Sequence, residues 1–220
     1  AESGLKEIGD YAFSAANLSG EVILPQSVEI LGEGAFRGTA CTKFTFEAGS
    51  KMTAMGDSVF ANCGKLTEVE NFPSGITKIP DSSFMSDKVL AKVTYAAPEK
   101  MTGIGASAFS GCEVLVSDAS YSPITENMVT IGASAFMGCK GEQFTTVTIP
   151  ASVTKLEQNT FANCLSLATV TFTNTESVTE IAAKCFANDG ALTECELPAK
   201  LEVLGDSAFG ATALPHVRIP

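Results

Sequence analysis

The chain has 220 residues, of which 45% are hydrophobic and 18% are charged, so it can bury a substantial core. Acidic residues outnumber Lys and Arg by 25 to 14, and the net charge of −11 argues against nucleic acid or anionic lipid as a partner. No apolar run approaches the roughly 18 residues that a membrane-spanning helix needs, so membrane insertion is not expected.

The two ends of the chain carry no targeting feature. The first residues, AESGLKEIGDYAF, lack the basic and apolar parts of a signal peptide, and the last residues end on a strand-like VRIP. Both ends fall inside the repeating pattern described next. We therefore expect a fragment of a longer protein, in which a signal or anchor lies outside this segment.

A phenylalanine recurs along the whole chain at intervals of 23 to 27 residues. Five residues before each one stands a large aliphatic residue or Met, and in most units a glycine follows that residue directly. The phenylalanines, in chain order, are Phe13, Phe36, Phe60, Phe84, Phe109, Phe136, Phe161, Phe186 and Phe209. Repeats of this length indicate a solenoid, because one unit cannot bury its apolar side chains alone and must stack on its neighbours.

A short strand is predicted after each phenylalanine. The pattern is apolar-x-x-apolar-x-apolar, as in Leu167-Val170-Phe172, and its alternation is typical of a strand with one buried face. A proline often follows and ends the strand, because it has no N–H to donate. Each unit is thus predicted to contain a strand of about three residues, a turn, and a short helical or 3-10 segment that carries the phenylalanine. The glycine after the first aliphatic residue, as at Gly32 and Gly132, suits a position without room for a Cβ atom.

Several units resemble the BspA-like leucine-rich repeats of bacterial surface proteins. The segments IGDYAFSAA, LGEGAFRGT, IGASAFSGC, IGASAFMGC and LGDSAFGAT carry the I-G-x-x-A-F block of that family, and VTIP, ELP and VRIP resemble its strand ends. The resemblance implies a single right-handed parallel β-solenoid domain over residues 1–220, with about nine coils of 23–27 residues. It also implies a secreted or cell-surface protein of a gut or oral bacterium, and adhesion as the role proposed for some members.

Two units depart from the pattern. The unit around Phe84 reads IPDSSF, with proline in place of the glycine. The unit from Phe109 to Phe136 is 27 residues long and includes an irregular stretch over 113–128. We expect a local bulge there, with the repeat frame retained.

The seven cysteines do not form a metal-binding pattern. A zinc site commonly needs a close pair of thiolates, and no such pair occurs here. Four cysteines lie three residues after a phenylalanine and are predicted to form one column: Cys63, Cys112, Cys139 and Cys164. Disulfides between adjacent coils are within geometric reach, but Asp87 and Asp189 occupy the same column. We expect buried free thiols that fill a tight interior turn.

No catalytic arrangement is predicted. The single histidine, His216, lies four residues from the end of the chain, without a nucleophile to serve. Glu194 and Glu196 share one strand face, as do Glu68 and Glu70, and a solvated surface explains both pairs. Nucleotide and calcium motifs are absent. We therefore expect no enzyme activity, no catalytic or metal-ligating residue and no cofactor.

The outward positions of the predicted strands form a candidate binding face, the surface that repeat proteins commonly use. These positions hold threonines and charges but no aromatic residue, which disfavours sugar binding by ring stacking and favours contact with protein. The same residue types also keep an exposed sheet soluble. The candidate residues are Thr45, Glu68, Glu70, Thr94, Thr148, Thr171, Thr173, Glu194, Glu196 and Arg218.

Two functions follow from these observations. The first is an extracellular, non-enzymatic binding or adhesion module. It would be a monomer that contacts a host matrix protein or a bacterial surface protein through this face or through residues 113–128. The alternative is a passive spacer that presents another domain of a longer cell-surface protein.

Overall fold

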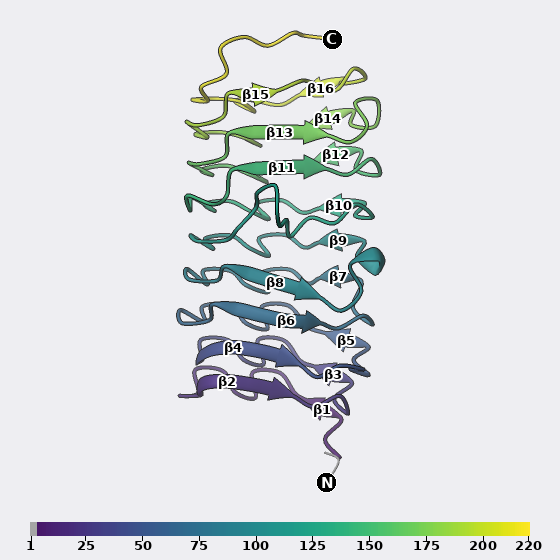
Figure 1. Cartoon of the computed structure of the whole chain (residues 1–220), viewed down its shortest axis with the longest axis vertical. Helices are drawn as coiled ribbons and strands as arrows, with labels where there is room; N and C mark the ends of the chain where they lie inside the picture. The colour runs from purple at the N-terminus through teal and green to yellow at the C-terminus, as the bar shows by residue number, and fades with distance from the viewer. Residues whose placement is uncertain (1–3) are drawn as a thin grey trace.

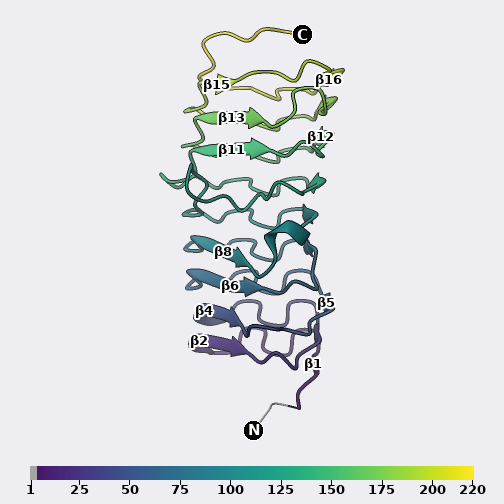
Figure 2. The ribbon, with the colours of Figure 1, turned by 45° about the vertical axis from the view of Figure 1, so that its right-hand side comes forward.

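The computed structural model describes residues 4–220, and residues 1–3 of the predicted domain lie outside the described residues. The described chain forms a parallel β-solenoid of about eight turns, stacked along its long axis from the N-terminus to the C-terminus (Figure 1). A view turned by 45° shows the same order of coils (Figure 2). The predicted solenoid is confirmed.

One side of the solenoid carries the longer strands, and we call it the long-strand face. Its strands form a four-stranded sheet, β2-β4-β6-β8, and a three-stranded sheet, β11-β13-β15. All their pairings are parallel. The bounds are β2 (Ser19–Leu24), β4 (Ala40–Phe46), β6 (Glu68–Phe72), β8 (Lys92–Tyr95), β11 (Thr146–Ile149), β13 (Thr169–Phe172) and β15 (Glu194–Cys195). The predicted strands up to β15 are therefore present, and β4 reaches seven residues.

A second ladder, of two-residue strands, lies at the aliphatic residue five positions before each phenylalanine, and it was not among the predicted elements. It forms three sheets, β1-β3-β5, β7-β9-β10 and β12-β14-β16. The bounds are β1 (Glu7–Ile8), β3 (Ile30–Leu31), β5 (Ala54–Met55), β7 (Lys78–Ile79), β9 (Gly103–Ile104), β10 (Thr130–Ile131), β12 (Lys155–Leu156), β14 (Glu180–Ile181) and β16 (Val203–Leu204).

The break between β5 and β7 has a cause in the sequence. On one side of the break, the Gly56 N–H donates to the Leu31 carbonyl over 2.9 Å. On the other side, the Gly105 N–H donates to the Ile79 carbonyl over 2.8 Å. Pro80 occupies this position in the intervening coil and has no N–H to donate. The ladder is therefore interrupted at the unit that departs from the glycine pattern.

The segments that carry the phenylalanines are turns, so the prediction of helical or 3-10 segments there was wrong. The helix that the described residues contain is η1 (Pro98–Lys100), which lies elsewhere in its coil. The residues two before and two after each phenylalanine have positive φ, as Ser107 and Gly111 do around Phe109. Because of these positive φ values, every second N–H in the turn points to the next coil. Ser107, Phe109 and Gly111, for example, donate to carbonyls of that coil over 2.8–2.9 Å. A helix would direct these groups along its own segment instead.

Nine phenylalanine rings form one continuous stack through the core, with centroids 5.0 to 6.1 Å apart and planes within 17° of parallel. These rings span about eight turns, one fewer than the nine coils predicted. The last predicted strand is not formed, and Val217 and Ile219 are exposed. β15 ends at Cys195 and leaves that segment without a strand to pair with.

The glycine after the first aliphatic residue sits where two coils touch. A Cβ atom on Gly32 would lie 2.4 Å from the backbone nitrogen of Asp10 in the preceding coil. Likewise, a Cβ atom on Gly105 would lie 2.7 Å from the backbone nitrogen of Asp81. The prediction that a Cβ atom has no room here is confirmed.

Within residues 4–220, no helix is long and apolar enough to cross a bilayer.

Candidate functional site

The long-strand face is divided by an irregular segment, residues 118–124, which we call the strap. No strand lies on this face between β8 and β11 (Figure 1). The coil frame continues beneath the strap, since Leu115 is buried and Ser117 pairs with Phe144 in a parallel bridge. The predicted bulge within 113–128 is thus present, and it separates the face into a part below the strap and a part above it.

The strap is held on β8 by side-chain hydrogen bonds. The Tyr121 hydroxyl donates to the Val93 carbonyl over 2.7 Å and accepts from the Val93 N–H over 3.1 Å. The Tyr95 hydroxyl donates to the Pro123 carbonyl over 2.8 Å. Tyr121 therefore satisfies the backbone groups that a further strand would have paired. Tyr121 was not among the residues predicted from the sequence, although the unusual length of its unit was a signal.

The strap is also closed on itself. One Asp118 carboxylate oxygen accepts hydrogen bonds from the N–H and hydroxyl of Ser120, both at 2.7 Å, and from the Tyr121 N–H at 3.1 Å. The bonds from Ser120 hold the pKa of Asp118 below its ordinary value. This segment is a defined turn whose polar groups bond one another.

Below the strap, the candidate residues bond one another. The Lys43 amino group lies 2.8 Å from a Glu70 carboxylate oxygen and 3.8 Å from one of Glu68, and its bond to Glu70 raises the pKa of Lys43. The Thr45 hydroxyl donates to Glu21 and Glu70 over 3.0 and 3.5 Å. This part of the candidate face is largely occupied with its own partners.

Two further groups below the strap are also engaged. The Thr94 hydroxyl accepts a hydrogen bond from the Asn71 N–H over 3.1 Å. The Lys92 amino group lies 4.9 Å from the centroid of the Tyr121 ring, a cation–π contact. The structure thus brings Thr45, Glu68 and Glu70 together and places Thr94 beside them.

Above the strap, the shortness of β15 opens a shallow hollow of about 280 Å³. β13 pairs with β15 only at Thr169–Glu194 and Val170–Cys195, so Phe172 has no strand neighbour on that side. The segment that follows, Glu196-Leu197-Pro198, leaves the ladder before its proline. Phe172 and Cys195 are left half-buried beside Val170 and form the apolar floor of the hollow.

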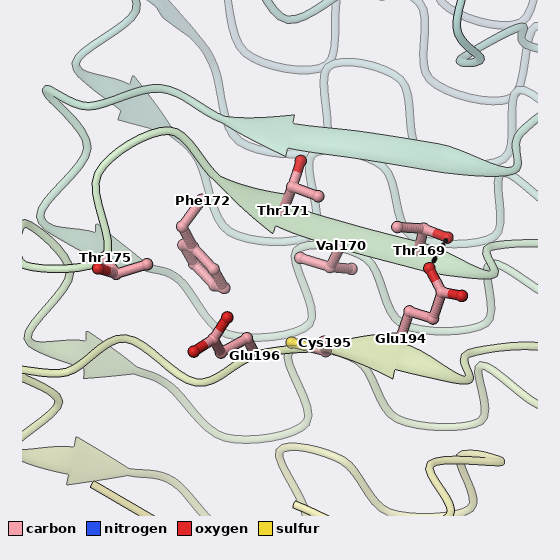
Figure 3. A pocket seen from close by; sticks show the side chains of 8 residues that line it. All are labelled: Thr169, Val170, Thr171, Phe172, Thr175, Glu194, Cys195 and Glu196. Atoms are coloured by element: carbon pink, nitrogen blue, oxygen red, sulfur yellow. Dashed lines mark hydrogen bonds between the residues drawn. The ribbon is translucent and has the colours of Figure 1, made fainter. Parts of the chain in front are cut away.

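Two carboxylates border this hollow. Glu194 and Glu196 stand on either side of Cys195 (Figure 3). Glu194 accepts a hydrogen bond from the Thr169 hydroxyl over 3.2 Å. Across the described residues, neither glutamate takes part in an ion pair. The hollow therefore combines an apolar floor with two exposed carboxylates that form no ion pair within the described residues.

Of the remaining candidate residues, one lines this hollow and the others lie on or after neighbouring strands. Thr171 lines it, and its hydroxyl is 3.0 Å from that of Thr148 on β11. Thr173 follows β13 and is exposed. Arg218 lies with Glu196 beside a second hollow of about 340 Å³ near the end of the chain. Thr148, Thr171, Glu194 and Glu196 are thus brought together on adjacent coils, apart from the group below the strap.

The hollow offers binding groups and little reactive chemistry. Burial raises the pKa of Cys195 to about 12, which keeps its thiol neutral at physiological pH. All seven cysteines are free, and six of them are buried. Over the described part of the chain, no group of three or more His, Cys, Asp and Glu side chains is arranged to hold a metal ion.

Comparisons with known proteins agree with this architecture. The model of the BspA type leucine rich repeat region matches residues 1–116 and 116–220, with six copies. The comparison with curated proteins finds no match.

Solved structures of bacterial leucine-rich repeat proteins have a similar fold. A leucine-rich repeat protein of T. pallidum is 23% identical, with a TM-score of 0.68 over 84% of this chain and 82% of that one. One from Bacteroides ovatus is 20% identical, with a TM-score of 0.52 over 94% and 68%. A leucine rich cell surface protein of Faecalibacterium prausnitzii is 22% identical, with a TM-score of 0.51 over 98% and 71%.

At these identities the solved structures show a shared fold, and the family match extends over the whole chain. The repeat pattern, the parallel coils and the match agree: this chain belongs to the family of BspA type leucine rich repeat proteins.

Proposed function

We propose that this chain is a non-enzymatic protein-binding module, and that it acts in adhesion at the bacterial cell surface or after secretion. The observation that carries the proposal is the hollow above the strap, where Glu194 and Glu196 have no basic partner among the described residues. A surface-exposed apolar floor with fixed charge beside it is suited to a partner's side chain.

The chemistry of the hollow favours a basic segment of the partner protein. A Lys or Arg side chain has an aliphatic stem that can pack on Phe172 and Cys195, and a charged head that can reach the glutamates. The net charge of −11 adds long-range attraction for such a segment. Host matrix proteins and bacterial surface proteins are the partner classes proposed.

The location is part of the proposal. The F. prausnitzii protein with this fold is described as a cell surface protein, which supports a similar location here.

A binding experiment with matched variants tests the proposal. The whole chain is measured by surface plasmon resonance against immobilised extracellular-matrix proteins, mucin and bacterial surface proteins. The Glu194→Gln/Glu196→Gln double variant is compared with Glu68→Gln/Glu70→Gln. The second variant removes two glutamate charges at the same spacing below the strap, where both already pair with Lys43. We expect the first variant to weaken binding at least tenfold and to reduce its salt dependence, and the second to change it less than twofold.

If binding is unchanged in the first variant but lost in the second, the binding site lies below the strap. Binding unaffected by either excludes the long-strand face as the interface. If no protein of the panel binds at micromolar concentration, adhesion is contradicted and the spacer function is favoured.

A further inference from the structure

From Thr39 to Asp189, the residue three positions after each phenylalanine is buried, and these residues form one column. Where the residue is cysteine, its thiol donates a hydrogen bond to the carbonyl of the preceding coil's phenylalanine. The bonds are Cys63 to Phe36 at 3.2 Å, Cys112 to Phe84 at 3.2 Å, Cys139 to Phe109 at 3.3 Å and Cys164 to Phe136 at 3.2 Å. The column is therefore a row of hydrogen-bond donors, each directed at a phenylalanine carbonyl.

Asp87 and Asp189 occupy the same position in two other coils, and both are fully buried. In each, one carboxyl oxygen accepts a backbone N–H of the preceding coil, from Cys63 at 2.7 Å and from Cys164 at 2.8 Å. The second oxygen of each carboxyl has no hydrogen-bond partner. A buried carboxylate with a single donor is strongly unfavourable, because nothing replaces its lost hydration.

The repeat suggests what the second oxygen does. In the thiol coils, this position supplies a proton to a phenylalanine carbonyl, and the equivalent acceptors here are the carbonyls of Phe60 and Phe161. A carboxylate has no proton to give, whereas a protonated carboxyl has one and still accepts the N–H at its other oxygen. The neutral acid therefore fits the column, and the ionised form does not.

We propose that Asp87 and Asp189 are neutral acids in the folded protein. They act as donors in the thiol column and make the stability of the solenoid dependent on two bound protons. This inference concerns the core and is independent of the proposed binding face.

The titratable groups that face the two acids are thiols, and none of them carries a positive charge that would stabilise a carboxylate. Asp87 is surrounded by the thiols of Cys63, Cys112 and Cys41 from neighbouring coils. Burial raises its pKa well above the ordinary range, although the hydrogen bond from the Cys63 N–H opposes the shift.

Asp189 has a similar environment, and its titratable neighbours are the thiols of Cys164 and Cys185. Burial raises the pKa of Asp189 to about 8, against the opposing bond from the Cys164 N–H. Among the interactions described for the two carboxyls, none comes from Lys, Arg or His.

The direction of the pH dependence follows from proton binding. An unfolded Asp has a pKa of about 3.9. Between that pH and the pKa of the folded state, which is about 8 for Asp189, the folded protein holds a proton that the unfolded chain has lost. Stability is therefore fully present below pH 4 and is lost progressively as pH rises toward 8. For each acid, the unfolding equilibrium constant increases up to about tenfold per pH unit.

Urea unfolding of the whole chain between pH 4.5 and 7.5 tests this. The parent is compared with Asp87→Asn/Asp189→Asn, because an amide can donate and accept but does not titrate in this range. We expect the base-10 logarithm of the unfolding equilibrium constant to rise more steeply with pH in the parent than in this variant. The difference in slope should reach about two per pH unit, because each acid contributes up to about one. Asp206→Asn, at an exposed position in the last coil, is the matched control and should leave the slope of the parent unchanged.

A second double variant and an infrared measurement test the protonation of the two acids further. If the Asn variant does not fold, Asp87→Cys/Asp189→Cys restores the usual donor of the column and should remove the extra slope. Infrared spectra of the folded parent at pH 7 should show a protonated-carboxyl band that is lost in either double variant. Equal slopes in parent and variants, or absence of that band, would overturn the proposal.

Discussion

A Cβ atom built on Gly132 would lie 2.5 Å from the backbone nitrogen of Ala106 in the preceding coil. Backbone atoms on both sides of this contact belong to stacked coils whose spacing is set by ladder hydrogen bonds. The absence of a side chain at this position is therefore a condition for close stacking.

Gly132→Ala should destabilise the fold by about 1–3 kcal/mol, because the added methyl group must push two coils apart. The measurement is the free energy of unfolding in urea. Gly9→Ala is the matched control: it is the same repeat position in the first coil, where no atom lies within 4 Å of the added Cβ. Equal losses in both variants would contradict steric confinement as the cause.

Tyr121→Phe should cost about 1–3 kcal/mol, because it removes the partner of both the N–H and the carbonyl of Val93. Amide hydrogen exchange should show faster exchange at Val93, which is buried beneath the strap. Tyr11→Phe removes an exposed hydroxyl that bonds Glu33 and should cost less than about 0.5 kcal/mol. Unchanged protection at Val93 would show that the strap does not seal the end of this sheet.

Phe136→Ala should cost about 3–5 kcal/mol, since the ring is fully buried and stacks on Phe109 and Phe161 at 5.4 and 5.5 Å. Phe13→Ala, at the 38% exposed ring that begins the stack, should cost clearly less. Thermal unfolding monitored by circular dichroism compares the two. A similar loss at both positions would mean that the stack does not depend on burial of its middle members.

Alkylation of the folded protein at pH 7.5 should label Cys195 first and slowly. Its thiol is half-buried, and burial raises its pKa to about 12, so little thiolate is present. The other six should react only after unfolding, since each is buried. Mass spectrometry counts the labels, and fewer than seven after denaturation without reductant would reveal a disulfide.

Much of the core could be predicted from residue types and spacing. The phenylalanine stack, the buried strand positions and the confined glycines all follow from a repeat in which equivalent residues must occupy equivalent places. The turn conformation around each phenylalanine could not be predicted in the same way. Its left-handed positions are occupied by Gly and Asn in some coils but by Tyr11, Lys184 or Ser207 in others.

The candidate face was predictable as a set of outward positions, but not in its division. Glu68 and Glu194 hold equivalent positions in their coils, yet Glu68 lies beside Lys43 whereas Glu194 has no basic partner among the described residues. That difference depends on which residue stands about 25 positions earlier, in the preceding coil, and on the strap between the two groups.

By itself, the sequence determined the repeat, the solenoid and the family, because the spacing of Phe is a local property that every coil shares and the glycine recurs in most of them. Only the tertiary structure decided where the face is interrupted, where a hollow opens beside Glu194 and Glu196, and why Asp87 can replace a cysteine. Each of these depends on hydrogen-bond partners supplied by a neighbouring coil, and the residues of one coil do not specify them.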